Sequence, residues 1–561
     1  KPENNAVAKL LGNSNPLMDY QYGADPYALV YDGRVYIYMT SDTDAYELDE
    51  DGNVVENDYG KIKTLTVISS ADMVNWTNHG RIKVAGSEGI ATWADNSWAP
   101  AITYKNIHGK DKFFLYFANN AGSIGVLTAD SPTGPWTDPL GESLITKSTP
   151  GVEDVVWCFD PAVLMDDDGQ AYLYFGGGFN EGESDNPKTA RVIKLGNDMI
   201  STVGEAKMID APCLFEDSGI HKYNGKYYYS YCTNFNQSSI DGYPGTGIIC
   251  YMVSDNPMGP FTYVGEALQN MYQFFEVGGN NHHAFFEFNG QWYVTYHAQT
   301  LGKALGIEKG YRSTHINEVE YYENGEIKPI TADMKGVSQL KAFSPYEETE
   351  GATIGWHKGL NAVALTDDLS AAPMALSMIN DGDWNAIGGV DFGGNGAKEF
   401  QVEAAGKAGG VIELRLDSPD GEKIGEVQIG EGDGKMAETY TCSVNDAAVG
   451  EHTLFFVFKG EGGDELFDIL SWQFTEKEQQ TVNKDALEEA IAQARAINSA
   501  EYTMDSLEKF FEVVEKAEGV YEDADATQAE VDSAAAELEA AYDLLVKVSD
   551  KTELQNLVAQ A

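Results

Sequence analysis

Residues 25–38 read DPYALVYDGRVYIY, in which two runs of apolar and aromatic residues flank an Asp32-Gly33 turn. This pattern predicts a β-hairpin, because Asp-Gly favours the tight turns that join antiparallel strands. Four later segments follow the same plan and begin at Trp98, Asp160, Glu216 and His282. One unit about every 60 residues fits a four-stranded blade, so five units predict an all-β five-bladed propeller over residues 1–345. A β-sandwich with many hairpins is the alternative, but it gives no reason for five equivalent units.

The composition limits the possible partners. The 561 residues suffice for several domains, and 43% hydrophobic with 22% charged residues is typical of globular proteins. The formal net charge of −52 disfavours binding to nucleic acid or to anionic membranes. No apolar run is long enough to predict a membrane span. Because the chain begins at Lys1 rather than Met, we expect a processed or trimmed product.

Two further domains are expected after the propeller. Between 346 and 476, cleanly alternating strands at 411–416 and 452–458 predict a small antiparallel β-sandwich of jelly-roll type. From 482 to 547, apolar residues at helical spacing predict a three-helix bundle. Residues 548–561 repeat the start of that bundle, which predicts the beginning of a second helical repeat.

The residues that open the five units should meet at one mouth of the propeller, because the first strand of each blade is innermost. Three of them are acids, namely Asp25, Asp160 and Glu216. A single Asp before Pro is most often a turn former. Like charges at a narrow mouth, however, raise one another's pKa and oppose folding. Three acids at the same position in different repeat units are therefore expected where a reaction or a metal ion needs them.

Glycoside hydrolysis needs two acids that flank the scissile bond, one protonated and one ionised. The first donates a proton to the departing sugar oxygen, and the second deprotonates a water molecule or attacks directly. A third acid can keep the donor protonated and correctly turned. Aromatic rings near this mouth would offer flat apolar faces to a sugar, with inter-blade packing as the competing interpretation; they are Trp93, Trp98, Trp157 and Phe275.

Four motifs resemble those of glycoside hydrolase family 43. They are GADP at 23–26, WCFDPAVL at 157–164, APCLFEDSG at 211–219 and GNNHHA at 279–284. The resemblance implies inversion by single displacement, with Asp25 as general base, Glu216 as general acid and Asp160 as the residue that tunes and orients the acid. An inverting pair leaves room for water, so the carboxyl groups of Asp25 and Glu216 should lie roughly 6.5–9.5 Å apart.

The same resemblance implies roles for other residues. His282 matches an axial histidine that, in many relatives, contacts a calcium ion largely through water, and His283 is its rival for that role. Arg312 matches an arginine near the substrate, with a structural salt bridge as the alternative. Asp217 lies next to Glu216 in the sequence, and the phase of the repeat favours Glu216 as the acid.

Five cysteines in so long a chain cannot form a disulfide framework, and their odd number leaves at least one unpaired. Cys158 and Cys213 lie just before two of the acids in the sequence. We expect them to be buried free thiols.

The second domain resembles carbohydrate-binding module family 6 at 381–384 (DGDW), 389–393 (GVDFG) and 467–470 (FDIL). Many such modules carry a ligand-stacking Trp in the loop before the strand that contains Tyr440. Here that loop is GKMAE at 434–438 and has no aromatic ring. Loss of the ring removes about 1–2 kcal/mol of stacking and burial. Sugar binding and a purely structural role are therefore both open, and Trp384 is expected in the core.

The helical region resembles the FIVAR-type modules of large surface and secreted proteins of Gram-positive bacteria. This resemblance implies a spacer, or contacts with other modules of a larger chain.

These features together predict a secreted or cell-surface bacterial enzyme that releases α-L-arabinofuranosyl side chains from arabinoxylan. Exo-β-1,4-xylosidase action on xylo-oligosaccharides is the alternative within the resemblance, because family 43 mixes both activities on one catalytic triad. A glycan-binding propeller without catalysis is the alternative from a different class. The expected partner is plant cell-wall polysaccharide, and the expected cofactor is Ca²⁺.

Overall fold

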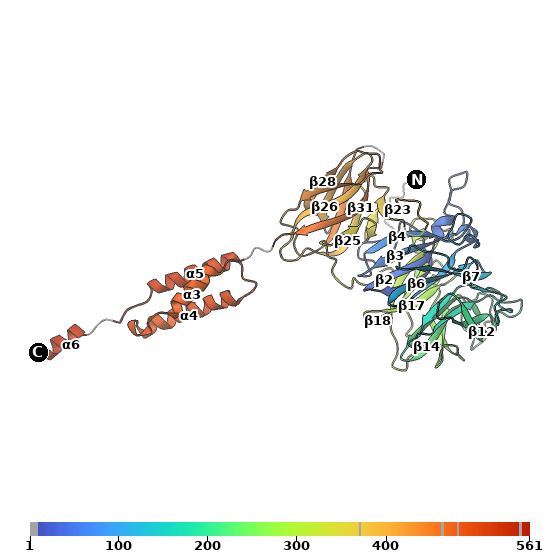
Figure 1. Ribbon diagram of the computed structural model, residues 1–561, viewed down its shortest axis with the longest axis horizontal. Helices are drawn as coiled ribbons and strands as arrows, with labels where there is room; N and C mark the ends of the chain where they lie inside the picture. Colours follow the sequence, from blue (N-terminus) through green and yellow to red (C-terminus); the bar gives the residue numbers. More distant parts are fainter. Residues whose placement is uncertain (1–8, 370–371, 462–464, 479–481, 549–551) are drawn as a thin grey trace. The chain divides into compact units, whose positions relative to one another are not determined.

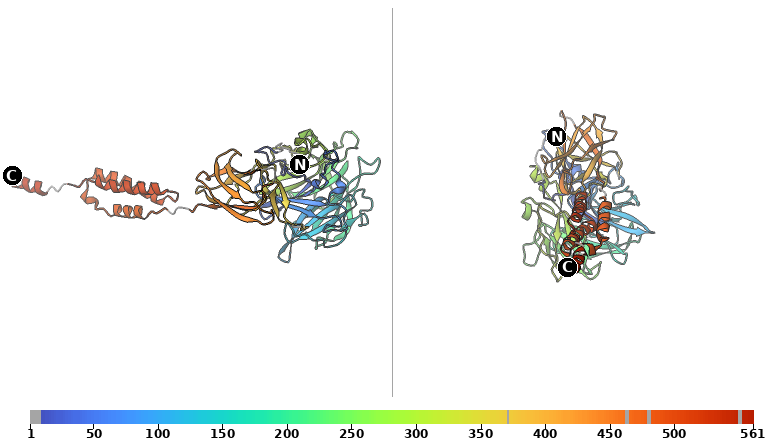
Figure 2. Two further views of the ribbon diagram at one scale, coloured as in Figure 1. Left: turned by 90° about the horizontal axis from the view of Figure 1, so that it is seen from above. Right: turned by 90° about the vertical axis from the view of Figure 1, so that its left-hand side faces the viewer.

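The computed structural model describes residues 9–369, 372–461, 465–478, 482–548 and 552–561. The chain divides into two compact units, Lys1–Lys477 and Glu478–Ala561. The first unit consists almost wholly of β-strands and the second of helices (Figures 1 and 2). None of the helices in the described residues is long and apolar enough to cross a membrane.

Five antiparallel sheets follow one another along the first part of the chain, and in each of them consecutive strands pair with one another. Their strands are β1 (Ala24–Tyr31), β2 (Arg34–Thr40), β3 (Thr64–Ser70) and β4 (Trp76–Lys83); β5 (Trp98–Ile107), β6 (Lys110–Asn119), β7 (Ser123–Ala129) and β8 (Ile145–Thr146); β9 (Ala162–Met165), β10 (Ala171–Gly176), β11 (Ala190–Leu195) and β12 (Thr202–Ile209); β13 (Leu214–Tyr223), β14 (Lys226–Thr233), β15 (Ile249–Ser254) and β16 (Thr262–Leu268); and β17 (His283–Phe288), β18 (Gln291–Ala298) and β19 (Ser313–Val319).

The five sheets close into a ring. Their first strands contact one another in the order β1, β5, β9, β13, β17 and back to β1. A separate hydrophobic core fills each space between neighbouring sheets. The space between the last and first sheets is closed by side chains that include Ile37, Phe286 and Tyr293. Apolar burial between sheets therefore holds the starts of distant strands together.

Four of the five first strands enter their sheets through an irregular turn. The backbone is left-handed at Asp25 (φ 47°), Ala99 (φ 40°), Asp160 (φ 51°) and Asp217 (φ 70°). In β1, β5 and β13 the pairing register also shifts at this point. Asp217, rather than Glu216, is thus the structural equivalent of Asp25. The sequence-based alignment of the repeats is wrong by one residue at Trp98 and at Glu216.

A β-sandwich follows within the same unit. One sheet has the strand order β23-β24-β31-β26-β29, with β20 also paired to β31, and the other has the order β22-β25-β30-β27-β28. The strands are β20 (Thr349–Glu350), β22 (Trp356–Lys358), β23 (Asn361–Ala364), β24 (Met374–Ser377), β25 (Trp384–Asp391), β26 (Ala397–Gly406), β27 (Gly410–Leu416), β28 (Lys423–Ile429), β29 (Glu438–Ser443), β30 (Glu451–Lys459) and β31 (Phe467–Glu476).

The sandwich is joined to the first sheet by backbone pairing, because β21 (Thr353–Ile354) adds to the edge strand β4. Asn75 strengthens this junction, since its side chain donates to the Gly388 carbonyl and accepts the Gly388 N–H. Trp384 is buried against Phe455, as expected for a core residue.

The second unit contains α3 (Asp485–Arg495), α4 (Met504–Glu522) and α5 (Gln528–Asp543), each of which contacts the other two. Their shared core includes Leu487, Phe510, Val514 and Leu538. The helix α6 (Thr552–Gln560) follows. The predicted repeat start at 548–561 includes residues 549–551, which lie outside the described residues.

Replacing Leu538 with Ala should destabilise the helical unit by about 2–5 kcal/mol, because this side chain is fully buried and its loss leaves a cavity. Two calorimetric transitions are expected for the whole chain, and only that of the helical unit should move. A matching shift of both transitions would contradict the independence of the two units.

Candidate active site

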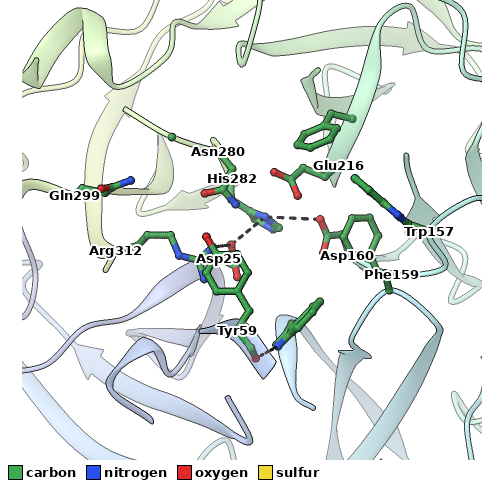
Figure 3. A pocket seen from close by; sticks show the side chains of 14 residues that line it. Asp25, Tyr59, Trp157, Phe159, Asp160, Glu216, Asn280, His282, Gln299 and Arg312 are labelled. Carbon is green, nitrogen blue, oxygen red and sulfur yellow. Dashed lines mark hydrogen bonds and ion pairs between the residues drawn. The ribbon is translucent and has the colours of Figure 1, made fainter. Parts of the chain in front are cut away.

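A cavity of about 480 Å³ lies where the first strands of the ring begin (Figure 3). It is lined by Asp25, Tyr59, Trp98, Ala121, Trp157, Phe159, Asp160, Phe215, Glu216, Gly279, Asn280, His282, Gln299 and Arg312. All three predicted catalytic acids therefore reach one cavity, although they are far apart in the sequence.

Several neighbours hold the side chain of Asp25 in place. Its carboxylate accepts the Thr40 hydroxyl at 2.7 Å and lies 3.2 Å from both Arg312 Nη1 and His282 Nδ1. Its backbone N–H donates to His297 Nδ1 at 3.0 Å. These contacts fix one orientation of the carboxylate at the start of β1.

Asp25 is ionised at neutral pH. Burial opposes its charge, but the Arg312 guanidinium and, after it, the His282 and His297 rings together hold the pKa of Asp25 well below its ordinary value. His282 contributes little charge at neutral pH, because burial lowers its own pKa to about 4. An ionised carboxylate beside a cavity can accept a proton from water.

Glu216 has the opposite ionisation. Its side chain is buried, and Oε1 has no hydrogen-bond partner among the described residues. Burial and the negative charge of Asp25 raise the pKa of Glu216 to about 8. Glu216 therefore keeps its proton at neutral pH and can donate it.

Asp160 lies beside Glu216, and its own pKa is also raised. Burial, followed by the charges of Glu216 and Asp25, raises the pKa of Asp160 well above its ordinary value. The Asp217 N–H opposes that rise, because it donates to Asp160 Oδ2 at 2.9 Å. The cavity thus holds a proton acceptor, a proton donor and a third carboxyl group.

His282 lies among the carboxyl groups of three aspartates. Its Nδ1 is 3.2 Å from Asp25 Oδ1 and 3.9 Å from Asp160 Oδ2, and its Nε2 is 3.2 Å from Asp217 Oδ1. No group of three or more His, Cys, Asp and Glu side chains in the described part of the chain could hold a metal ion.

His283 and Asp217 form a buried network beneath the cavity and do not line it. Asp217 accepts the backbone N–H of His283 and is hydrogen-bonded to its ring Nδ1, and the ring Nε2 lies 2.6 Å from Ser230 Oγ. Burial raises the pKa of Asp217 well above its ordinary value and lowers that of His283 well below. Of the acid pair, Glu216 faces the cavity.

Arg312 lines the cavity and also forms buried salt bridges. Its Nε and Nη2 each donate to Asp42 at 2.8 Å, and Nη1 donates to Asp25 at 3.2 Å. Its guanidinium lies 4.6 Å from the centre of the Tyr59 ring. The two sequence-based interpretations of Arg312 are thus compatible.

The structure separates the four predicted aromatic residues into two pairs. Trp98 and Trp157 line the cavity. Trp93 does not, because its ring stacks on Phe117 and its Nε1 donates to Asp138. Phe275 packs against His315 and is also outside the lining. The expectation that Trp93 and Phe275 face a sugar in this cavity is therefore corrected.

Sequence reasoning missed several lining residues. Phe159 and Phe215 precede Asp160 and Glu216 directly in the recognised motifs, so they could have been predicted. Two more lining residues, Tyr59 and Gln299, lie outside those motifs and repeats, and the sequence carries no comparable signal for them. The same holds for Asp42, which binds Arg312 but does not line the cavity. Cys158 and Cys213 are buried free thiols, as expected.

One ionised and one protonated carboxyl group between aromatic walls form the type of site that glycoside hydrolases use. The family description "Glycosyl hydrolases family 43" matches residues 14–327, and "Carbohydrate binding module (family 6)" matches residues 350–476. The chain belongs to glycosyl hydrolase family 43.

Relatives support this membership over most of the chain. An "Arabinoxylan arabinofuranohydrolase" of Paenibacillus polymyxa is 54% identical over 487 residues, which cover 84% of this chain and 76% of the relative. Another of the same name from Bacillus subtilis (strain 168) is 51% identical over 490 residues, which cover 84% of this chain and 94% of that relative. A crystal structure of a family 43 arabinoxylan arabinofuranohydrolase from Bacillus subtilis, in complex with cellotetraose, is similar with a TM-score of 0.81 and 50% identity, covering 84% of this chain and 99% of that chain.

The raised pKa of Glu216 makes a prediction about stability. Between pH 4.5 and about 8 the folded chain holds a proton on Glu216 that the unfolded chain has lost, so stability should fall as pH rises through this range. Glu216→Gln removes this linkage and should be more stable than the parent at pH 8 by on the order of 3 kcal/mol, with little difference at pH 4.5. Denaturant unfolding at both pH values measures this. An equal difference at both would contradict a protonated, buried Glu216.

Proposed function

We propose that this chain releases α-L-arabinofuranosyl side chains from arabinoxylan by an inverting mechanism. The observation that carries the proposal is the cavity in which Asp25, Asp160 and Glu216 meet with opposite ionisation of the first and last. The names of the two relatives that cover 84% of the chain support the choice of substrate.

In the proposed reaction, Asp25 takes a proton from a water molecule that attacks the anomeric carbon. Glu216 gives its proton to the departing glycosidic oxygen, and Asp160, in the same cavity, is the group to which we assign the orientation of that donor. A separation of roughly 6.5–9.5 Å between the carboxyl groups of Asp25 and Glu216 would leave room for the water. The rings of Trp98 and Trp157 would bound the sugar with apolar faces.

We also propose the finer architecture that the sequence predicts. The closed ring of first strands, with a core between each pair of sheets, supports a five-bladed propeller whose axis passes near the cavity. The mutual contacts of α3, α4 and α5 support a three-helix bundle of FIVAR type. Secretion and display at the surface of a Gram-positive bacterium fit a polysaccharide substrate.

Glu216→Gln should lower the rate of arabinose release from arabinoxylan by about 10²–10⁴-fold, because glutamine has the same shape and no acidic proton. Chromatography of the released sugars measures the rate and the product together. Binding of the polysaccharide should persist, since the cavity is unchanged in size.

Glu318→Gln is the matched control, because Glu318 is exposed on β19 and lies outside the cavity lining. It should leave the rate unchanged. Release of xylose instead of arabinose by the parent chain would contradict the proposed substrate, and an inert parent chain would contradict catalysis.

Calcium remains a proposal, with His282 reaching the ion through water rather than as a direct ligand. No step of the mechanism depends on it. Removal of calcium by a chelator should lower the melting temperature of the first unit, and re-addition of Ca²⁺ should restore it. A chelator that leaves both the melting temperature and the rate unchanged would contradict the proposal.

A further inference from the structure

We propose that Asp42 is a positioning residue for the reaction. It holds Arg312 so that a single N–H of the guanidinium, rather than a pair, meets Asp25. This inference deepens the proposed function and rests on it, because it takes Asp25 as the general base.

Asp42 gathers four donors in a buried site. Its Oδ2 accepts Arg312 Nε at 2.8 Å, the Arg312 backbone N–H at 3.0 Å and Asn57 Nδ2 at 2.9 Å. Its Oδ1 accepts Arg312 Nη2 at 2.8 Å. The side chain of Asp42 is 0% exposed and that of Arg312 is 4% exposed. Water therefore does not compete for these bonds.

We call the bonds from Arg312 and Asn57 to Asp42 the clamp. The clamp leaves the Arg312 guanidinium one direction in which to meet Asp25. The Nε and Nη2 edge of the guanidinium is occupied by Asp42, and the Tyr59 ring lies 4.6 Å away. Only Nη1 reaches Asp25 Oδ1, at 3.2 Å. The other oxygen, Oδ2, stays with the Thr40 hydroxyl at 2.7 Å.

A free guanidinium would behave differently. Arginine binds carboxylates preferentially through two parallel N–H groups, and such bidentate pairs are short and strong. If Arg312 turned in this way toward Asp25, both carboxylate oxygens would be engaged and the carboxylate would rotate away from Thr40. A general base held in that pose would lose its reach toward water. Asp42 prevents the turn because its bonds to Nε and Nη2 fix the plane and position of the guanidinium, so that the Nη1 and Nη2 edge is not turned toward Asp25.

Asp42→Asn tests the clamp because it keeps the shape of the side chain. Asparagine has one acceptor oxygen where aspartate has two, so an amide N–H would face one of the Arg312 donors. Release of the guanidinium should lower kcat on an aryl arabinofuranoside by about 100-fold, the scale expected for misplacement of a catalytic group by about 1 Å. KM should stay within about 3-fold, because the cavity walls are unchanged. Asp42→Glu, which restores the charge, should recover part of the lost kcat.

Asp44 provides the matched control. It lies in the same short helix, Asp42–Ala45, and also accepts four bonds, from the Lys63 and Thr64 N–H groups, the Thr64 hydroxyl and Arg81 Nη1. It does not line the cavity. Asp44→Asn should therefore cost stability comparable to that of Asp42→Asn and leave kcat within about 3-fold of the parent.

The decisive comparison is a double-mutant cycle with Arg312→Lys, since lysine lacks the fork that Asp42 holds. If Asp42 acts through Arg312, Asp42→Asn should cost less than about 3-fold in kcat in that background. A full 100-fold loss there, or no loss in the parent background, would overturn the inference.

Two further outcomes are distinguishable. If Asp42→Asn does not fold, Asn57→Ala removes one donor from the clamp and should lower kcat by about 3–10-fold; an unchanged kcat would overturn the inference. A parent chain that hydrolyses no glycoside would contradict the proposed function itself, whereas an active parent that tolerates Asp42→Asn contradicts only the role of Asp42.

Discussion

The ion pair between Arg312 and Asp25 is the interaction on which the site depends. Both side chains are buried, and burial alone would favour a neutral Asp25. At Asp25 the arginine is the largest of the influences that together overcome burial, while burial and the negative charge of Asp25 raise the pKa values of Glu216 and Asp160. Chemically similar carboxyl groups thus take different protonation states within one cavity, and Arg312 is the main positive charge that keeps Asp25 ionised.

Such a site opposes folding, and the rest of the first unit must supply the stability. Buried carboxyl groups without full partners cost free energy, and Glu216 Oε1 has none among the described residues. The compensation comes from the apolar cores between successive sheets, which also close the ring between the last sheet and the first. The left-handed entries at Asp25 and Asp160 are maintained by this framework.

Sequence periodicity could predict the five sheets because each hairpin carries its own turn signal and its own alternation of apolar residues. The same periodicity could not fix the phase at the mouth, because the irregular entry of β13 displaces Glu216 by one position relative to Asp25. Glu216 faces the cavity, although Asp217 is the residue that corresponds to Asp25 in the repeat. The family 43 motif, rather than the position in the repeat, is what identifies Glu216.

The expected positions of Trp93 and Phe275 were wrong because their rings pack against Phe117 and His315, and no local sequence pattern predicts these contacts. Asp42 has no repeat equivalent and could be found only from its contacts.

In the proposed reaction Asp25 acts as a base toward water rather than as a nucleophile, and the configuration of the newly formed sugar tests this directly. Proton NMR of the first product, recorded before mutarotation, should show the anomeric configuration inverted relative to the substrate. Retention of configuration would contradict the account, because it would require a covalent intermediate between the sugar and the protein.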